Sequence, residues 1–131
     1  MRTAAALLLV ALCVSCAPPP PKPLTAAHLR KIEATLKARD LDMPKEIAVQ
    51  SDGFVVAEYE IPSGSYQGLR ARAFAEERLR AIYEALMFDG FRDLRVNVNG
   101  LPPPGNGVIW RYGSAQFIAS RPRAEWVTPD N

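Results

Sequence analysis

The chain has very little cysteine, and both of its cysteines lie near the N-terminal end. Cys13 and Cys16 are the only thiols among 131 residues. The rest of the chain therefore has no disulfide framework, no cysteine-based metal site and no cysteine nucleophile. A sequence without other thiols still places these two in its first segment, which indicates that chemistry takes place there.

The chain also lacks a strong charge of either sign. Its 16 basic and 14 acidic residues leave a formal charge of +2. Such a balance gives no electrostatic reason to expect a nucleic-acid partner, which a clustered basic face would attract. The hydrophobic fraction of 48% is typical of one globular domain with short additional segments.

Residues suited to catalysis or metal binding are scarce. His28 is the only histidine, it has no triad partner nearby, and we interpret it as a surface residue. The acidic residues show no metal-ligand spacing, and there is no glycine-rich phosphate loop. We therefore expect a non-enzymatic protein without metal or cofactor. Carboxylates that are distant in sequence can still form a pair in the folded chain. An exported enzyme is therefore a third alternative.

Residues 1–15 are typical of a signal peptide. A short basic start with Arg2 precedes an uncharged apolar run over residues 4–14. This run has about eleven residues, whereas a membrane-spanning helix needs about 20. Cleavage after Ala17 would be an ordinary small-x-small event, but it places Pro18 directly after the scissile bond, where the proline ring fits poorly. Cleavage between Ser15 and Cys16 avoids this problem.

The segment Leu12-Cys13-Val14-Ser15-Cys16 resembles the lipobox of bacterial membrane lipoproteins. Ser15 fits the family pattern, whereas Cys13 stands where leucine is usual. The resemblance covers the signal segment alone. It implies a diacylglyceryl thioether on Cys16, usually with an added acyl chain, which suffices for stable membrane anchoring. Ala17 resembles the residue that follows the cysteine in outer-membrane lipoproteins. This implies a lipid anchor in the cell envelope, facing the periplasm, at the outer membrane where the cell has one.

A proline-rich stretch follows Cys16. Residues 18–21 are all proline, and Pro23 follows after Lys22. Such a sequence favours polyproline II, a semi-rigid spacer of about 3 Å per residue. A ligand for a proline-binding partner is the alternative. We divide the chain into a signal peptide (1–15), a lipidated cysteine with its spacer (16–23), and a small α+β domain with a C-terminal tail (24–131).

Periodicity predicts an α-β-β-α-β-β order in this domain. Thr25 is a plausible N-cap for an amphipathic helix over 25–39, and the strongest helix covers 65–88. Residues 46–50 and 54–61 predict a hairpin. Its apolar pattern favours Val55 opposite Val49, with Gly53 left-handed. Residues 94–99 and 108–119 predict two more strands. The expected fold is a two-layer sandwich, a four-stranded antiparallel sheet with two helices on one face.

The second strand pair contains the candidate contact residues. If Val98 pairs with Val108, Arg95 lies directly opposite Arg111 on the outward face, and Asn97 lies beside them. Like charges in that relation destabilise a sheet unless they are compensated. An ion-pair network with Glu58 and Glu60 is one interpretation, and a site for an anion or an acidic partner is the other.

Two further features could contact a partner. Leu101 stands in a loop with three consecutive prolines, and loops of such length are often contact surfaces. A plain strand connection is the alternative. Trp126, in the tail, is expected to cover the core as a lid.

Together these features favour a membrane-anchored envelope lipoprotein whose domain binds an envelope protein as an accessory subunit. The alternative is a periplasmic domain that binds a small ligand or cell-wall fragment on its open sheet face. An aromatic-lined concave pocket would favour the ligand. A flat face, or an exposed apolar edge at Leu101, would favour the protein partner.

Overall fold

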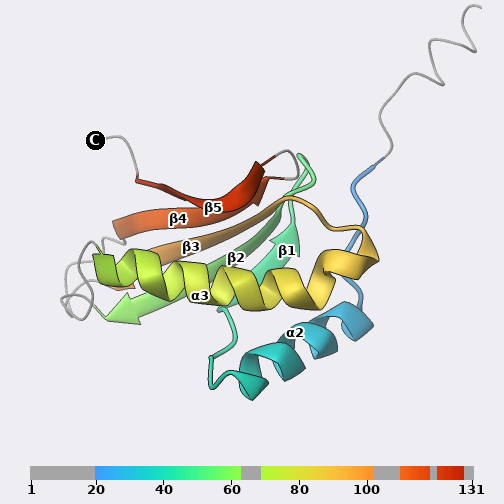
Figure 1. Cartoon of the computed structure of the whole chain (residues 1–131), viewed down its shortest axis with the longest axis horizontal. Helices are drawn as coiled ribbons and strands as arrows, with labels where there is room; N and C mark the ends of the chain where they lie inside the picture. Colours follow the sequence, from blue (N-terminus) through green and yellow to red (C-terminus); the bar gives the residue numbers. More distant parts are fainter. Residues whose placement is uncertain (1–19, 63–68, 102–109, 119–120, 129–131) are drawn as a thin grey trace, which may run out of the picture.

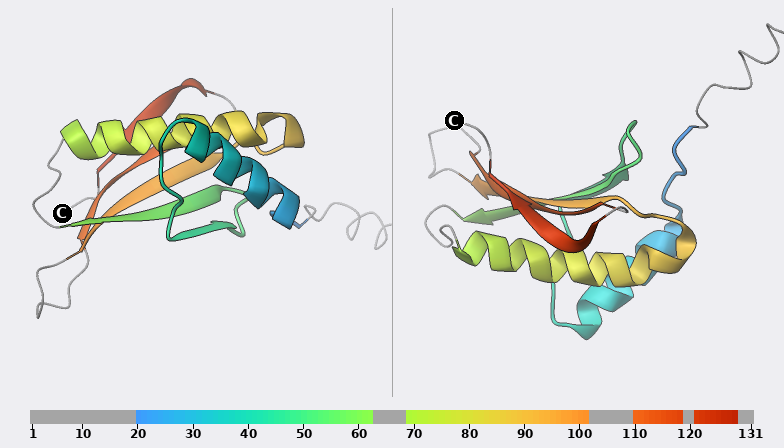
Figure 2. Two further views of the ribbon diagram at one scale, coloured as in Figure 1. Left: turned by 90° about the horizontal axis from the view of Figure 1, so that it is seen from below. Right: turned by 45° about the horizontal axis from the view of Figure 1, so that its top comes forward.

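The computed structural model describes residues 20–62, 69–101, 110–118 and 121–128. They form two layers, a five-stranded sheet with two α-helices on one side of it (Figures 1 and 2). In chain order the elements are α2 (Ala26–Ala38), β1 (Glu46–Val49), β2 (Val55–Pro62), α3 (Leu69–Leu86), the 3₁₀ helix η1 (Met87–Asp89), β3 (Leu94–Leu101), β4 (Trp110–Ile118) and β5 (Arg121–Val127). The predicted α+β class is confirmed. None of the helices in these ranges is both long and apolar enough to cross a membrane.

Helix α2 begins and ends where local sequence signals predict. The Thr25 hydroxyl accepts a hydrogen bond from the His28 backbone N–H at 3.3 Å, and His28 Nδ1 accepts one from the Thr25 backbone N–H at 2.9 Å. This reciprocal pair satisfies free N–H groups of the first turn. At the other end Asp40 adopts a φ of 55°, and the Leu41 N–H bonds to the Leu36 carbonyl at 2.9 Å. The helix thus closes in a left-handed cap.

The first hairpin has the predicted register. Val49 pairs with Val55 and Ile47 pairs with Ala57. Gly53 has a φ of 88°, which a residue without Cβ adopts at little cost. The apolar pattern was therefore sufficient to choose the register.

The sheet is mixed, so the predicted four-stranded antiparallel sheet is wrong. The strand order is β1-β2-β3-β4-β5, and the central strands β2 and β3 run parallel. Helix α3 carries the chain back across the sheet between them (Figure 1). A parallel pair needs a long crossover of this kind, because a tight turn can join only antiparallel neighbours.

The predicted register between β3 and β4 is also wrong. Val98 pairs with Gly113 and Leu94 with Phe117, whereas the prediction paired them with Val108 and Tyr112. Ala115, opposite Val96, is fully buried on the helix side. The approach of α3 to the sheet thus favours a small residue here, a constraint that strand alternation does not contain.

Part of the predicted tail is a fifth strand. Strand β5 pairs antiparallel with β4 at the sheet edge, and Ala115 lies opposite Trp126. Pro122 weakened the strand signal of this segment, but an edge strand tolerates a proline, which cannot donate to a ladder. Trp126 packs against the core as predicted, from a strand position.

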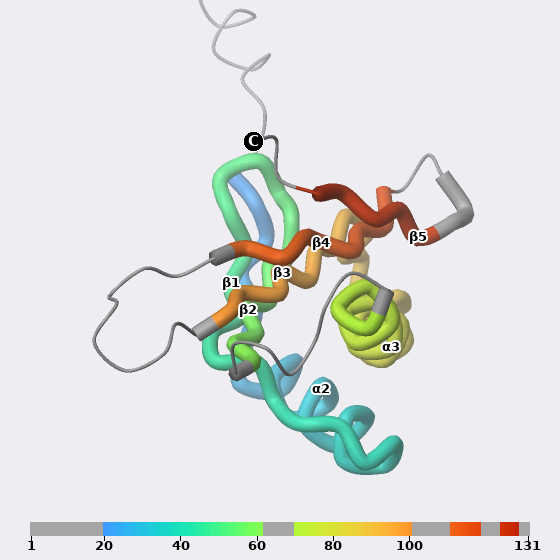
Figure 3. The backbone as a smooth tube through the Cα atoms, turned by 90° about the vertical axis from the view of Figure 1, so that its left-hand side faces the viewer, coloured from blue at the N-terminus to red at the C-terminus, as the bar shows by residue number. Residues whose placement is uncertain are grey.

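The core lies between the sheet and the two helices. Figure 3 shows α3 nearly end-on, with the sheet on one side and α2 on another. The predicted stripe of α3 is buried at Ala75, Leu79, Ile82 and Leu86, whereas Tyr83 lies at its margin and is 38% exposed. From α2, Ile32 and Leu36 complete the same cluster.

Candidate functional site

Polar side chains gather on the sheet face that neither described helix covers, which we call the open face. Strand pairing arranges this face in three rows: Val56, Arg95, Gln116 and Glu125; Glu58, Asn97, Ser114 and Val127; and Glu60, Asn99 and Arg111. The alternate residues, such as Ala57, Val96 and Ala115, are buried in the core. The open face is polar because successive side chains of a strand point to opposite sides.

Glu58 is the centre of the hydrogen-bond network on this face. Its Oε1 accepts from Asn97 Nδ2 at 2.7 Å, and its Oε2 accepts from Asn99 Nδ2 at 2.7 Å. Arg111 Nη2 lies 3.4 Å from the same Oε1. Asn97 is only 3% exposed and also accepts from the Ser114 hydroxyl at 2.5 Å. A buried amide needs such partners, so the network holds the middle strands in register.

Arg95 and Arg111 do not face each other. Arg95 lies opposite Gln116, and Arg111 lies opposite Asn99. Each donates through Nε to its neighbour's side-chain oxygen at 3.2 Å. The Arg95 guanidinium also lies 4.6 Å from the Phe54 ring centre, a favourable cation–π contact. The predicted like-charge pair is therefore wrong, although both arginines are on the predicted face. The register of the β3–β4 pair shifts at a β-bulge between Val98 and Asn99, and this shift puts the Arg111 side chain on the open face.

Like charges meet at another place on this face. Glu46 of β1 lies opposite Glu58 of β2. Lys45 is next to them and pairs with Glu60 at 2.7 Å. The hydrogen bond and the charge of Glu60 raise the pKa of Lys45 above its usual value. The acidic end of the face is thus compensated by a lysine of the loop before β1.

A shallow hollow in the open face brings three predicted contact residues together. Its volume is about 410 Å³, and it is lined by Arg95, Asn97, Arg111, Ser114, Gln116, Val127 and Thr128. That volume suits a small ligand, but small-ligand sites are lined mainly by apolar and aromatic residues, whereas every described lining residue here except Val127 is of a polar or charged type. Guanidinium, amide and hydroxyl groups are the donors that bind carboxylates and other anions. The hollow is chemically suited to an acidic group.

Two other predicted residues cannot be placed in the site. The predicted loop position of Leu101 is wrong, because Leu101 is the last residue of β3 and pairs with Pro62 of β2; its side chain lies outside the described structure. Cys16 lies outside the described residues altogether.

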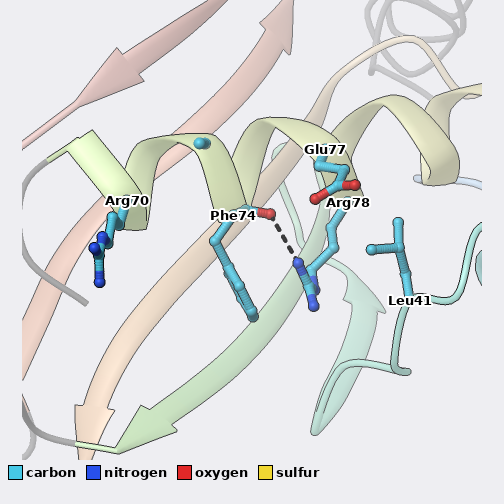
Figure 4. A pocket seen from close by; sticks show the side chains of 6 residues that line it. Leu41, Arg70, Phe74, Glu77 and Arg78 are labelled. Atoms are coloured by element: carbon cyan, nitrogen blue, oxygen red, sulfur yellow. Dashed lines mark hydrogen bonds between the residues drawn. The ribbon is translucent and has the colours of Figure 1, made fainter. Parts of the chain in front are cut away.

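A second hollow, of about 290 Å³, lies at the surface of α3 and reaches Leu41 (Figure 4). Arg78 borders it but is only 8% exposed. The Arg78 guanidinium lies 3.4 Å from the Phe74 ring centre, and Nη1 donates to the Phe74 carbonyl at 3.2 Å. Its Nε and Nη2 donate to Asp42 Oδ1 at 3.0 and 2.5 Å. These contacts assign Arg78 a structural role, which ties α3 to the connection between α2 and β1.

Sequence reasoning did not single out Arg78. The signal was present, because positions 71, 75, 78 and 82 share one helical face and the other three carry Ala71, Ala75 and Ile82. Tyr59 belongs to the same cluster, and its hydroxyl donates to the Asp42 carbonyl at 2.8 Å. Burial raises the pKa of Tyr59 well above its usual value.

Among the described residues no three or more histidine, cysteine, aspartate or glutamate side chains are placed to hold a metal ion. Comparison with known protein families, curated proteins and solved structures gives no match. The function is therefore inferred from the geometry of the open face and from the N-terminal sequence.

Proposed function

We propose that the protein is a lipid-anchored cell-envelope lipoprotein whose non-enzymatic domain binds an envelope protein through its open face. The anchor rests on the lipobox-like segment that ends at Cys16 and on the proline spacer after it. Two or more acyl chains hold a protein on a membrane stably, whereas one is marginal. Ala17 favours the outer membrane where the cell has one, with the domain in the periplasm.

The observation that carries the binding proposal is the polar hollow with an arginine near each end. Arg95 and Arg111 lie in different rows, with Asn97 and Ser114 in the row between them. Along a strand, such rows are about 7 Å apart. The two guanidinium groups match a surface that carries spaced carboxylates, whereas the buried Asn97 amide and Ser114 hydroxyl between them already bond within the face. We therefore expect an acidic segment of the partner to lie across β3 and β4.

A small acidic ligand is the second candidate. The volume of about 410 Å³ is within the range of small-ligand sites, roughly 300–1,000 Å³. A carboxylated cell-wall fragment would use the same donors. None of the described residues that line the hollow is aromatic, which favours the protein partner.

Site-specific crosslinking in intact cells tests the partner. A photoreactive residue replaces Gln116 in the hollow, and a matched probe replaces Arg70 on the exposed surface of α3. We expect a discrete adduct from position 116 that is absent from position 70. The Arg95→Ala and Arg111→Ala changes should weaken it. Equal adducts from both positions, or an adduct insensitive to both changes, would contradict the proposal.

The small-ligand alternative has a separate measurement. Thermal unfolding of the purified chain with and without carboxylated cell-wall fragments reports binding, because a ligand that binds the native state raises the midpoint. A midpoint increase that Arg95→Ala removes would favour the ligand over the protein partner. If the midpoint is unchanged, these fragments do not bind, and the crosslinking result alone tests the protein partner.

The anchor is tested by mass measurement on the chain extracted with detergent from its native envelope. We expect cleavage before Cys16 and the added mass of the lipid chains, and neither modification in Cys16→Ser. A hydrophilic product that begins at Pro18 would overturn the anchor. Ala17→Asp tests the membrane, because it should reduce the outer-membrane fraction in a cell that has one.

A further inference from the structure

The end of α3 exposes large apolar side chains that the fold does not use. Phe88 is 88% exposed and Met87 is 41% exposed. Both belong to η1, in which no residue is buried. Burial of such side chains would stabilise the fold, and this arrangement leaves them in contact with solvent instead. Single exposed apolar residues are common. Exposure alone therefore does not identify Phe88 and Met87 as a contact surface, and their location in the molecule must supply the evidence.

The N-terminal segment is held against this same turn. Lys22 Nζ donates to the Asp89 carbonyl at 2.5 Å and lies 5.3 Å from the Phe91 ring centre. Lys31 Nζ pairs with the Asp89 carboxylate at 3.0 Å. In Figures 1 and 2 the segment before α2 runs beside the turn that follows α3. The chain therefore leaves the domain next to Phe88.

The distance from this exit to the lipid site is short. Only residues 17–21 separate Lys22 from Cys16, and most of them are proline. A chain of this length extended at about 3.1 Å per residue, the rise of polyproline II, would span about 20 Å between Cys16 and Lys22. A lipid on Cys16 thus brings the turn at η1 close to the bilayer.

We infer that η1 docks on the bilayer that holds the lipid of Cys16, with Phe88 and Met87 at the headgroup boundary. This inference rests on the proposed lipid anchor. Phenylalanine is a side chain that amphipathic surface segments bury at this boundary. Lys22, Lys31 and the exposed Arg92 outnumber the acidic Asp89 and Asp93 of this segment, and the remaining positive charge complements anionic headgroups.

The lipid anchor explains how two apolar side chains are enough to dock the domain on the bilayer. Phe88 and Met87 are too few to hold a free protein on a membrane, but a short tether gives them a high effective concentration at the bilayer. Docking at η1 also sets the orientation of the domain. The far end of α3, 18 residues away, then lies about 27 Å further along the helix axis. The open face lies on the side of the sheet away from α3 (Figure 2), so docking at η1 leaves it accessible to an envelope partner.

Spin labelling of the full lipidated chain tests this docking. The chain expected after cleavage before Cys16 has no other free thiol, so one introduced cysteine is labelled uniquely. Met87→Cys carries the nitroxide with Phe88 intact, and Arg70→Cys is the control at the other end of α3. The labelled proteins are placed in vesicles of phosphatidylethanolamine and phosphatidylglycerol. Collision rates with oxygen, which concentrates in lipid, and with a nickel chelate, which stays in water, report the location of each label.

We expect the label at position 87 to favour oxygen several-fold over the control label, and this preference to fall when Phe88→Ser is added. If lipid mass on Cys16 is confirmed but both labels meet the nickel chelate equally, the docking is wrong and the anchor stands. A label shielded from both reagents indicates a protein occupant and also overturns the docking. Absence of lipid mass overturns the anchor and the docking together.

Discussion

Arg78 of α3 donates two hydrogen bonds to the carboxylate oxygen Oδ1 of Asp42, in the connection before β1. The pair joins the helical layer to the loop that leads into the sheet. The Arg78 side chain is 10% exposed, whereas that of Asp42 is 63% exposed. The pair is therefore asymmetric, and its contribution to stability comes mainly from the packing and hydrogen bonds of the arginine.

We predict that Arg78→Ala lowers the free energy of unfolding by about 2–3 kcal/mol, because it removes buried side-chain packing together with hydrogen bonds. Arg78→Lys should fall between it and the wild type, because an ammonium cannot reproduce the planar fork. Urea denaturation measures both. Arg80→Ala, at an exposed position on the same helix, is the matched control and should change stability by less than about 0.5 kcal/mol. Equal effects of Arg78→Ala and Arg80→Ala would contradict the structural role.

Glu58 is expected to hold the open face together. Glu58→Ala leaves the buried amide of Asn97 without one partner, which should cost about 1–3 kcal/mol in unfolding free energy. Glu46→Ala is the control from the neighbouring strand. It removes a like charge directly opposite Glu58, so it should be neutral or slightly stabilising. Denaturant titration of both variants decides the matter. A loss for Glu46→Ala as large as that for Glu58→Ala would show that Glu58 has no special part.

The ion pair between Lys31 and Asp89, in the turn after α3, should make the protein less stable at acid pH. The hydrogen bond from Lys31 lowers the pKa of Asp89 below its usual value. The ionised carboxylate therefore contributes stability in full above about pH 4, its unfolded value, and this contribution is lost as the pH falls through the lower folded pKa. Asp89→Asn should be less stable than the wild type near neutral pH, and the two should converge in acid.

Carbon-detected NMR titration of the Asp89 carboxyl group measures this pKa directly. In Lys31→Met the pKa should return toward the ordinary aspartate value. An unchanged titration in that variant would show that Lys31 is not the cause.

Gly113 tests the register of β4. A Cβ at this position would lie 2.3 Å from Cζ2 of Trp126, closer than two carbon atoms can approach. Gly113→Ala should therefore lower stability by about 1–3 kcal/mol through overpacking. Trp126→Ala removes the clash, so the double variant should be more stable than the sum of the single changes implies. Strict additivity in this cycle would contradict the placement of Trp126 over Gly113.

The sequence by itself determined the local structure. Thr25 marks the start of α2, and Gly53 with its flanking apolar residues determined the first hairpin. These signals depend on residues a few positions apart, so they can be read along the chain. The sequence likewise predicts the lipid anchor at Cys16, which depends on a short contiguous motif.

The tertiary structure alone decided how these pieces meet. The parallel pairing of β2 with β3 depends on the path of α3, and the β4 register depends on what fits beneath that helix, such as Ala115. Strand preference depends on neighbours that are distant in sequence, and so β5 was not recognised despite Trp126. Arg95, Asn97 and Arg111 were correctly placed on one face, but their partners were not. Glu58 became the centre of the site because a crossover brings β3 beside β2, a contact between distant residues that strand alternation does not specify.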